Sequence, residues 1–145
     1  MTDPLTILYE SLSDNPEQNP VTNMQGDKVW LNKIGLPHRE DGPAIIRKGG
    51  TKEWKIDGRF HREDGPAIER PDGTKEWFKH NDRHREDGPA VESANGSSEY
   101  WLEDRIMSKG KWLQDPSVQR VLALKKLENK DIKDDDFLRT FGGVL

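Results

Sequence analysis

Histidine and carboxylate residues recur together at three places in this chain. The heptapeptide His-Arg-Glu-Asp-Gly-Pro-Ala runs over 38–44, 61–67 and 84–90, and successive copies are offset by 23 residues. A histidine with Glu and Asp two and three residues later is a set suited to general acid–base catalysis or to metal binding. One hypothesis is therefore a hydrolase or metal-dependent enzyme that uses this series of His, Glu and Asp residues.

The spacing of the copies favours a structural role instead. Neighbouring β-strands lie ~4.8 Å apart, so equivalent residues two strands apart sit roughly 10 Å from each other. A metal centre needs ligand atoms that converge to about 2 Å from one ion. We therefore predict no catalytic residue, no metal and no cofactor, and we expect His, Arg and the carboxylates to form a hydrogen-bonded ladder that orders the loops.

A fixed period with a seven-residue identity is typical of a repeat protein. Each copy is preceded by a turn glycine and a short segment ending in an aromatic residue, namely Trp30, Trp54, Trp77 and, in a degenerate fourth unit, Tyr100. Gly49-Gly50, Asp72-Gly73 and Asn95-Gly96 are hairpin signals, and Asp57-Gly58 is a second type of turn within the unit. The predicted fold is mainly β (α+β): a meandering antiparallel sheet of ~23-residue hairpin repeats, with one apolar and one polar face, the aromatic column on one face, and short helices at the N- and C-termini.

Three segments are expected. Residues 1–25 form an N-terminal helix and loop cap, residues 26–105 form the repeat sheet, and residues 106–145 form a C-terminal helical cap or interaction segment. In the last segment Asp115-Pro116 is a helix start, and the helix should run to about Asn129 before a second short helix begins at the Asp134–Asp136 run. The first of these helices is predicted to dock on the sheet through Val118, Val121, Leu122 and Leu127.

Composition narrows the class of protein further. The chain has 145 residues, of which 31% are hydrophobic and 34% charged, with a net charge of −4 and no cysteine. A thin fold with much exposed surface accounts for this balance. Basic and acidic residues are nearly matched across the repeats, so we expect no nucleic-acid partner. No segment is apolar enough for a membrane span, and a cytoplasmic location is the default expectation.

Two places are candidates for binding a partner. In the third unit, Phe78 follows Trp77, and strand alternation would turn Phe78 outward beside His80. Near the C-terminus, Phe137, Leu138 and Phe141 form an apolar group beyond the acidic run, which could project and contact a partner or a second copy of the chain. We therefore expect a protein partner of unknown identity, and a homo-oligomer is the other possibility that we consider.

The period of 23, the turn glycine before an aromatic strand and the heptapeptide together resemble the MORN-repeat variants, over about residues 26–105. These are β-hairpin repeats of bacterial and tailed-phage proteins, some of which are antitoxin components. The resemblance implies a scaffold for protein–protein interaction, such as a phage host-directed or counter-defence inhibitor acting in the host cytoplasm. The alternative that it implies is an antitoxin or immunity protein that binds a toxin.

Overall fold

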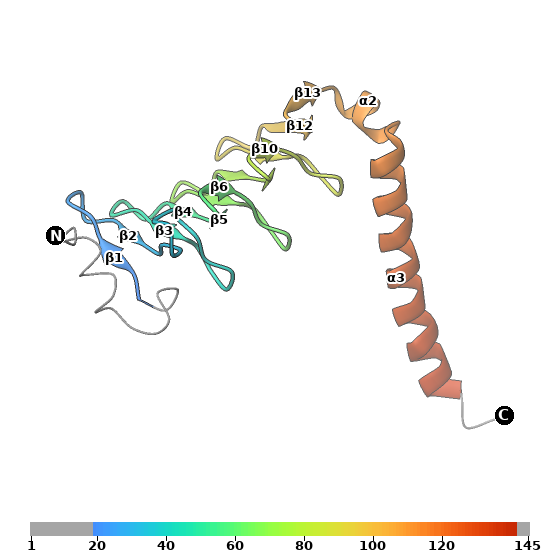
Figure 1. Cartoon of the computed structure of the whole chain (residues 1–145). Coiled ribbons are helices and arrows are strands. Elements are labelled where there is room, and N and C mark those ends of the chain that lie inside the picture. The colour runs from blue at the N-terminus through green and yellow to red at the C-terminus, as the bar shows by residue number, and fades with distance from the viewer. Residues whose placement is uncertain (1–18, 142–145) are drawn as a thin grey trace.

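The computed structural model describes residues 19–141, with side chains described for residues 19–130, and is an elongated row of hairpin units followed by a helix (Figure 1). Nine antiparallel strands form the main sheet in the order β1-β2-β3-β4-β7-β8-β11-β12-β13. Their bounds are Val21–Thr22, Lys28–Val29, Ile45–Ile46, Lys52–Glu53, Ile68–Glu69, Lys75–Glu76, Val91–Glu92, Ser98–Leu102 and Arg105–Met107. The predicted mainly β antiparallel fold is confirmed, and the sheet begins at Val21, earlier than the expected boundary at residue 26.

Each unit also carries a second, smaller hairpin. β5 (Lys55–Ile56) pairs with β6 (Arg59–Phe60), and β9 (Phe78–Lys79) pairs with β10 (Asp82–Arg83). The chain thus makes two different turns per unit. Gly50, Gly73 and Gly96 close the main-sheet turns at φ values of +100°, +95° and +85°, as the hairpin signals predicted. The second turn needs left-handed backbone at both central residues, and the predicted Asp57-Gly58 turn has φ of +49° and +79°.

The aromatic residue of each unit lies at the corner between these two hairpins. The N–H groups of Trp30, Trp54 and Trp77 donate to the carbonyls of the fully buried Ala44, Ala67 and Ala90 at 2.7–2.8 Å. Because the strands are only two residues long and the chain changes direction at the Trp, the alternation of faces does not carry across it.

The expectation that Phe78 is exposed is therefore wrong. Phe78 is only 8% exposed, and it packs in one apolar cluster with Ala67, Ile68 and the ring of Phe60 at 5.1 Å. Trp77, which precedes it, is itself half-buried. Both neighbours face protein, one on each side of the corner, so the Phe78 ring is not a free surface for a partner.

The main sheet also departs from a simple division into apolar and polar faces. Along it Ile45 pairs with Glu53, Glu53 with Ile68, Ile68 with Glu76, and Glu76 with Val91. Directly opposed residues share a face, so the two glutamates stand among the aliphatic residues of the buried face. Both are buried, at 8% and 6% exposure, which corrects the expected separation of faces.

Arginine side chains make this burial tolerable. Glu53 accepts from Arg47 Nε at 2.8 Å and lies 3.5 Å from Lys55 Nζ. Glu76 pairs with Arg70 and accepts from Arg83 Nη2 at 3.0 Å. The hydrogen bond to Glu53 raises the pKa of Arg47, and the hydrogen bond to Asp27 raises it by a smaller amount. A buried carboxylate is stable only when paired in this way.

Two helices end the described chain. α2 (Lys109–Leu113) begins at Ser108, whose Oγ accepts from the N–H of Lys111, and α3 spans Pro116–Phe141. The predicted start at Asp115-Pro116 is confirmed, since Asp115 Oδ1 accepts from the N–H of Ser117 at 2.9 Å. The predicted break near residue 130 is wrong. α3 is one helix of 26 residues, because the acidic run at 134–136 is compatible with helix interior and no proline or glycine interrupts it. The helix expected between residues 4 and 13 lies outside the described residues.

The helices cover the open end of the sheet. Trp112 of α2 packs against Tyr100 in a tilted arrangement with ring centroids 4.9 Å apart, and its Nε1 donates to the carbonyl of Arg85 at 2.9 Å. Val118 and Leu122 of α3 join this cluster, with Val118 fully buried. Docking through Leu127 is wrong: it is 55% exposed, since α3 leaves the sheet after its first two turns (Figure 1).

We expect Glu76→Gln to lower the free energy of unfolding by about 2–4 kcal/mol, because it leaves Arg70 and Arg83 without their shared carboxylate. Urea unfolding at pH 7 measures this. The matched control is Glu99→Gln, at the equivalent but exposed position of the fourth unit, which should change stability by less than about 0.5 kcal/mol. Equal effects at the two positions would contradict the account of Glu76.

Candidate functional site

An arginine of each heptapeptide lies flat against the tryptophan of the same unit. The Cζ atoms of Arg39, Arg62 and Arg85 lie 4.1, 3.9 and 3.8 Å from the ring centroids of Trp30, Trp54 and Trp77. Each Nε donates to the Asp two residues later at 2.8–3.0 Å, and each Nη1 donates to the Pro carbonyl four residues later at 3.0–3.2 Å. The guanidinium group thus holds the loop to the aromatic ring.

The glycine of the heptapeptide provides the space for this group. A Cβ at Gly42, Gly65 or Gly88 would lie 2.8–2.9 Å from the arginine Cζ of the same loop. None of these three glycines has positive φ, so they do not serve a left-handed turn. They are glycines because the guanidinium lies between the Trp ring and the glycine backbone.

The histidines are used within the fold through their ring nitrogens. Nδ1 of His38, His61 and His84 accepts from the backbone N–H of the residue 19 positions later, at 3.0–3.1 Å. On the other side of the ring, Nε2 of His61 and His84 lies 2.9 and 2.8 Å from the Glu two residues later. Each histidine therefore fixes its heptapeptide loop to the second turn of the next unit, in agreement with the predicted ladder.

The second turns carry strained backbone at non-glycine residues. His80 and Asn81 have φ of +48° and +75°, and Glu103 and Asp104 have +48° and +62°. Such angles cost free energy for residues other than glycine, so the surrounding contacts must compensate. His80 is exposed, and its ring stacks on that of His61 with centroids 4.4 Å apart.

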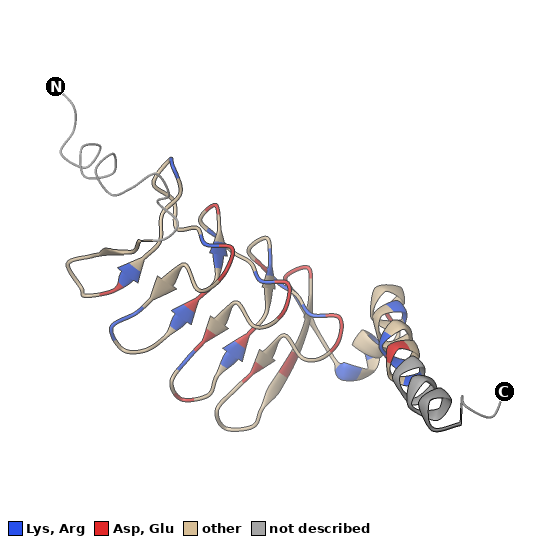
Figure 2. Cartoon of the chain, turned by 90° about the horizontal axis from the view of Figure 1, so that it is seen from below, with Lys and Arg blue, Asp and Glu red and all other residues tan. Residues whose placement is uncertain are grey.

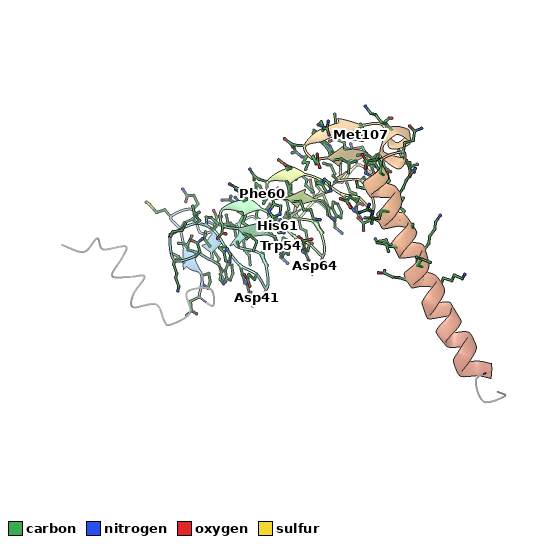
Figure 3. All side chains as sticks on the ribbon, turned by 45° about the vertical axis from the view of Figure 1, so that its right-hand side comes forward. Asp41, Trp54, Phe60, His61, Asp64 and Met107 are labelled. Atoms are coloured by element: carbon green, nitrogen blue, oxygen red, sulfur yellow. The ribbon has the colours of Figure 1, made fainter. Side chains whose placement is uncertain are left out.

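The acidic residues of the loops lie at their outer ends. Figure 3 shows Asp41 and Asp64 at the ends of neighbouring loops, with Trp54 and His61 nearer the sheet. The hydrogen bond from Arg62 lowers the pKa of Asp64. At Asp87, burial raises the pKa, but hydrogen bonds from Lys125 and Arg85 outweigh it, so the net pKa is lowered. All units mix both signs of charge (Figure 2).

Grooves separate successive loops. We call the space between loops 38–44 and 61–67 the first groove; Trp54, Ile56 and His80 line it, together with residues of both loops. The space between loops 61–67 and 84–90 is the second groove, lined by Trp77, Lys79 and, from α3, Val121. Sequence reasoning missed both the arginine stacks and the grooves. The signal for the stacks was the Arg that stands eight residues after the Trp in units two and three.

The residues predicted to bind a partner are not brought together. Phe78 is buried, whereas His80 is exposed at the rim of the first groove. Phe137, Leu138 and Phe141 belong to the last part of α3, and their side chains lie outside the described residues. Their roles stay predictions.

Among the residues that the structure describes, no group of three or more His, Asp and Glu residues is placed to hold a metal ion. No helix among these residues is long and apolar enough to cross a membrane. Comparisons with protein-family models, with curated proteins and with solved structures find no match.

Gly65→Ala should lower the free energy of unfolding by about 1–3 kcal/mol, because the new methyl group displaces Arg62 from Trp54. Urea unfolding followed by tryptophan fluorescence measures it. Gly49→Ala is the control: a Cβ there meets nothing within 4 Å, and its φ is not positive. A Gly65→Ala variant with the same free energy of unfolding as the wild type would contradict the requirement for space.

Acid should destabilise the fold through the carboxylates with lowered pKa. At Asp27 the largest cause of the lowered pKa is the hydrogen bond from the backbone N–H of Lys48. At Asp64 the largest cause is the hydrogen bond from Arg62. A pKa lowered on folding contributes stability that is present above the unfolded value of about 3.9 and is lost as pH falls through the folded value. The urea midpoint should thus be constant down to about pH 5 and then fall steadily. Asp64→Asn should reduce that fall, and a midpoint unchanged at pH 3 would contradict it.

Proposed function

We propose that the protein is a non-enzymatic protein–protein interaction module, in which the repeat sheet is a rigid scaffold and α3 is a partner-binding arm. The observation that carries this is the attachment of α3. Its first two turns dock through Val118 and Leu122, and the helix then continues away from the sheet to Phe141 (Figure 1). A helix of 26 residues is roughly 39 Å long, so its ribbon extends well beyond the turns that contact the scaffold (Figure 1).

The exposed part of this arm is partly apolar. Leu124 and Leu127 are 53% and 55% exposed, one turn apart on the helix. An isolated helix is weakly stable in water, and its stability in proteins comes mainly from packing of an apolar face. A long helix with exposed leucines is therefore suited to pack on another protein.

The use of the histidines supports a non-enzymatic reading. In all three loops Nδ1 is taken by a backbone N–H of the next turn, and the same contacts recur from unit to unit. A general base needs a nitrogen within reach of a substrate proton, whereas these rings hold one loop to another. The resemblance of the repeats to the MORN variants supports a scaffold as well.

Truncation after Lys130 tests the arm. The shortened chain should keep the urea midpoint of the full chain, because the docked residues are retained, and should lose a partner captured by the full chain from a bacterial lysate. The double variant Leu124→Glu/Leu127→Glu should weaken the same capture at least about tenfold. Gln119→Glu, an exposed position near the start of α3, is the control.

Light scattering on purified protein separates a second copy from a foreign partner. A dimer that becomes monomeric on truncation would identify the arm as a self-association element. Capture unaffected by truncation and by the double leucine variant would contradict the arm. A folded His61→Ala protein that loses a measurable catalytic activity of the wild type would favour the enzyme hypothesis.

A further inference from the structure

α3 forms part of the wall of one of the two grooves. Val121 lines the second groove, and Lys125 Nζ pairs with Asp87 at its rim. These two residues are four apart and so lie on the same side of the helix. One turn of α3, with an aliphatic residue and a lysine, thus lies beside a space bordered by two heptapeptide loops and narrows it.

The carboxylates of the loop beside α3 are less exposed than their equivalents in the other two loops. The side chains of Glu86 and Asp87 in the third loop are 27% and 31% exposed. The equivalent Glu63 and Asp64 are 68% and 85% exposed, and Glu40 and Asp41 are 76% and 86% exposed. The loops share one sequence and the same arginine stack. The lower exposure in the third loop is therefore due to the neighbouring helix and not to the loop itself.

The first groove has the same construction, and no helix residue among those that the structure describes lines it. Trp54 stands where the second groove has Trp77, and Asp64 stands where it has Asp87. Ile56 replaces Lys79, which makes the floor of the first groove more apolar. Its volume is about 690 Å³, against about 220 Å³ for the second groove beside Val121.

The rim of the first groove favours a basic occupant. Four carboxylates, of Glu40, Asp41, Glu63 and Asp64, surround two guanidinium groups, those of Arg39 and Arg62. Both guanidinium groups are held against Trp rings and bonded to the aspartates of their own loops. Lys79 Nζ lies 3.7 Å from Glu63, so three cations face the four carboxylates. The carboxylates are still in excess at the surface, and a lysine would be attracted there as Lys125 is to Asp87.

We propose that the first groove binds an amphipathic helix of a partner protein that carries an aliphatic residue followed four positions later by a lysine. The aliphatic side chain packs on Trp54 and Ile56, and the lysine pairs with Asp64. The proposal rests on the proposed function in that it presumes a partner protein, but it concerns a different surface from the exposed part of α3.

The probe is a fluorescein-labelled peptide with the sequence of residues 115–130, which carries Val121 and Lys125. It is titrated with the full-length protein and followed by fluorescence anisotropy at low salt. We expect saturable binding that weakens at least about fivefold when the peptide carries Lys125→Glu or Val121→Ser. In the protein, Asp64→Asn should weaken binding by a similar factor, and Glu99→Gln should leave it unchanged.

The peptide could instead displace the protein's own α3 from the second groove. Ile56→Lys distinguishes the two, since it gives the first groove the lysine that the second has at position 79 and leaves the second groove unaltered. The proposal expects Ile56→Lys to weaken binding at least about fivefold. Lys79→Ile should not weaken it, because Lys79 pairs with Glu63 and its removal leaves the rim of the first groove more acidic. The reverse pattern, or the absence of saturable binding, overturns it. Partner capture through α3 that persists in that case would leave the proposed arm intact, so the two failures are distinguishable.

Discussion

The stacking of an arginine between a tryptophan ring and a glycine is the interaction on which this fold depends. In each of three units the guanidinium fixes the loop internally through its Asp and Pro partners. The backbone N–H of the same arginine donates to the next unit, as from Arg62 to the carbonyl of Phe78 and from Arg85 to that of Trp101. The same arginine therefore holds its own loop in place and links that loop to the next unit. Strands of two residues would not hold the units together by themselves.

This arrangement explains how a chain with 31% hydrophobic residues can form an ordered sheet. Much of the burial is achieved by charged side chains whose apolar parts or planar groups cover aromatic rings. The buried Glu53 and Glu76 extend the same principle to the sheet face, where arginines neutralise them. Where the repeat ends, Trp112 of α2 covers Tyr100, the place that an arginine covers in the preceding units.

Because the loops are identical, the scaffold has two grooves of similar construction that differ in their neighbours. α3 borders the groove next to the cap, whereas among the described residues only repeat residues line the equivalent groove beside it. The unit-specific residues, such as Ile56 against Lys79, then decide what each groove accepts. In a repeat protein, partner recognition can thus reside where the units differ, while their shared residues maintain the fold.

The sequence by itself determined the period, the antiparallel hairpins and the start of α3, because glycine turns, the Asp-Pro pair and exact repetition are local signals. It also indicated that the histidines form a ladder, since a triple identity implies a shared structural task. Only the tertiary structure decided the burial of Phe78 and of the glutamates. The chain turns a corner at each Trp, and strand alternation read from sequence does not include that turn. The role of Gly65 is set by the approach of Arg62, and Val121 lines the second groove beside two loops. Both depend on residues that only folding brings together.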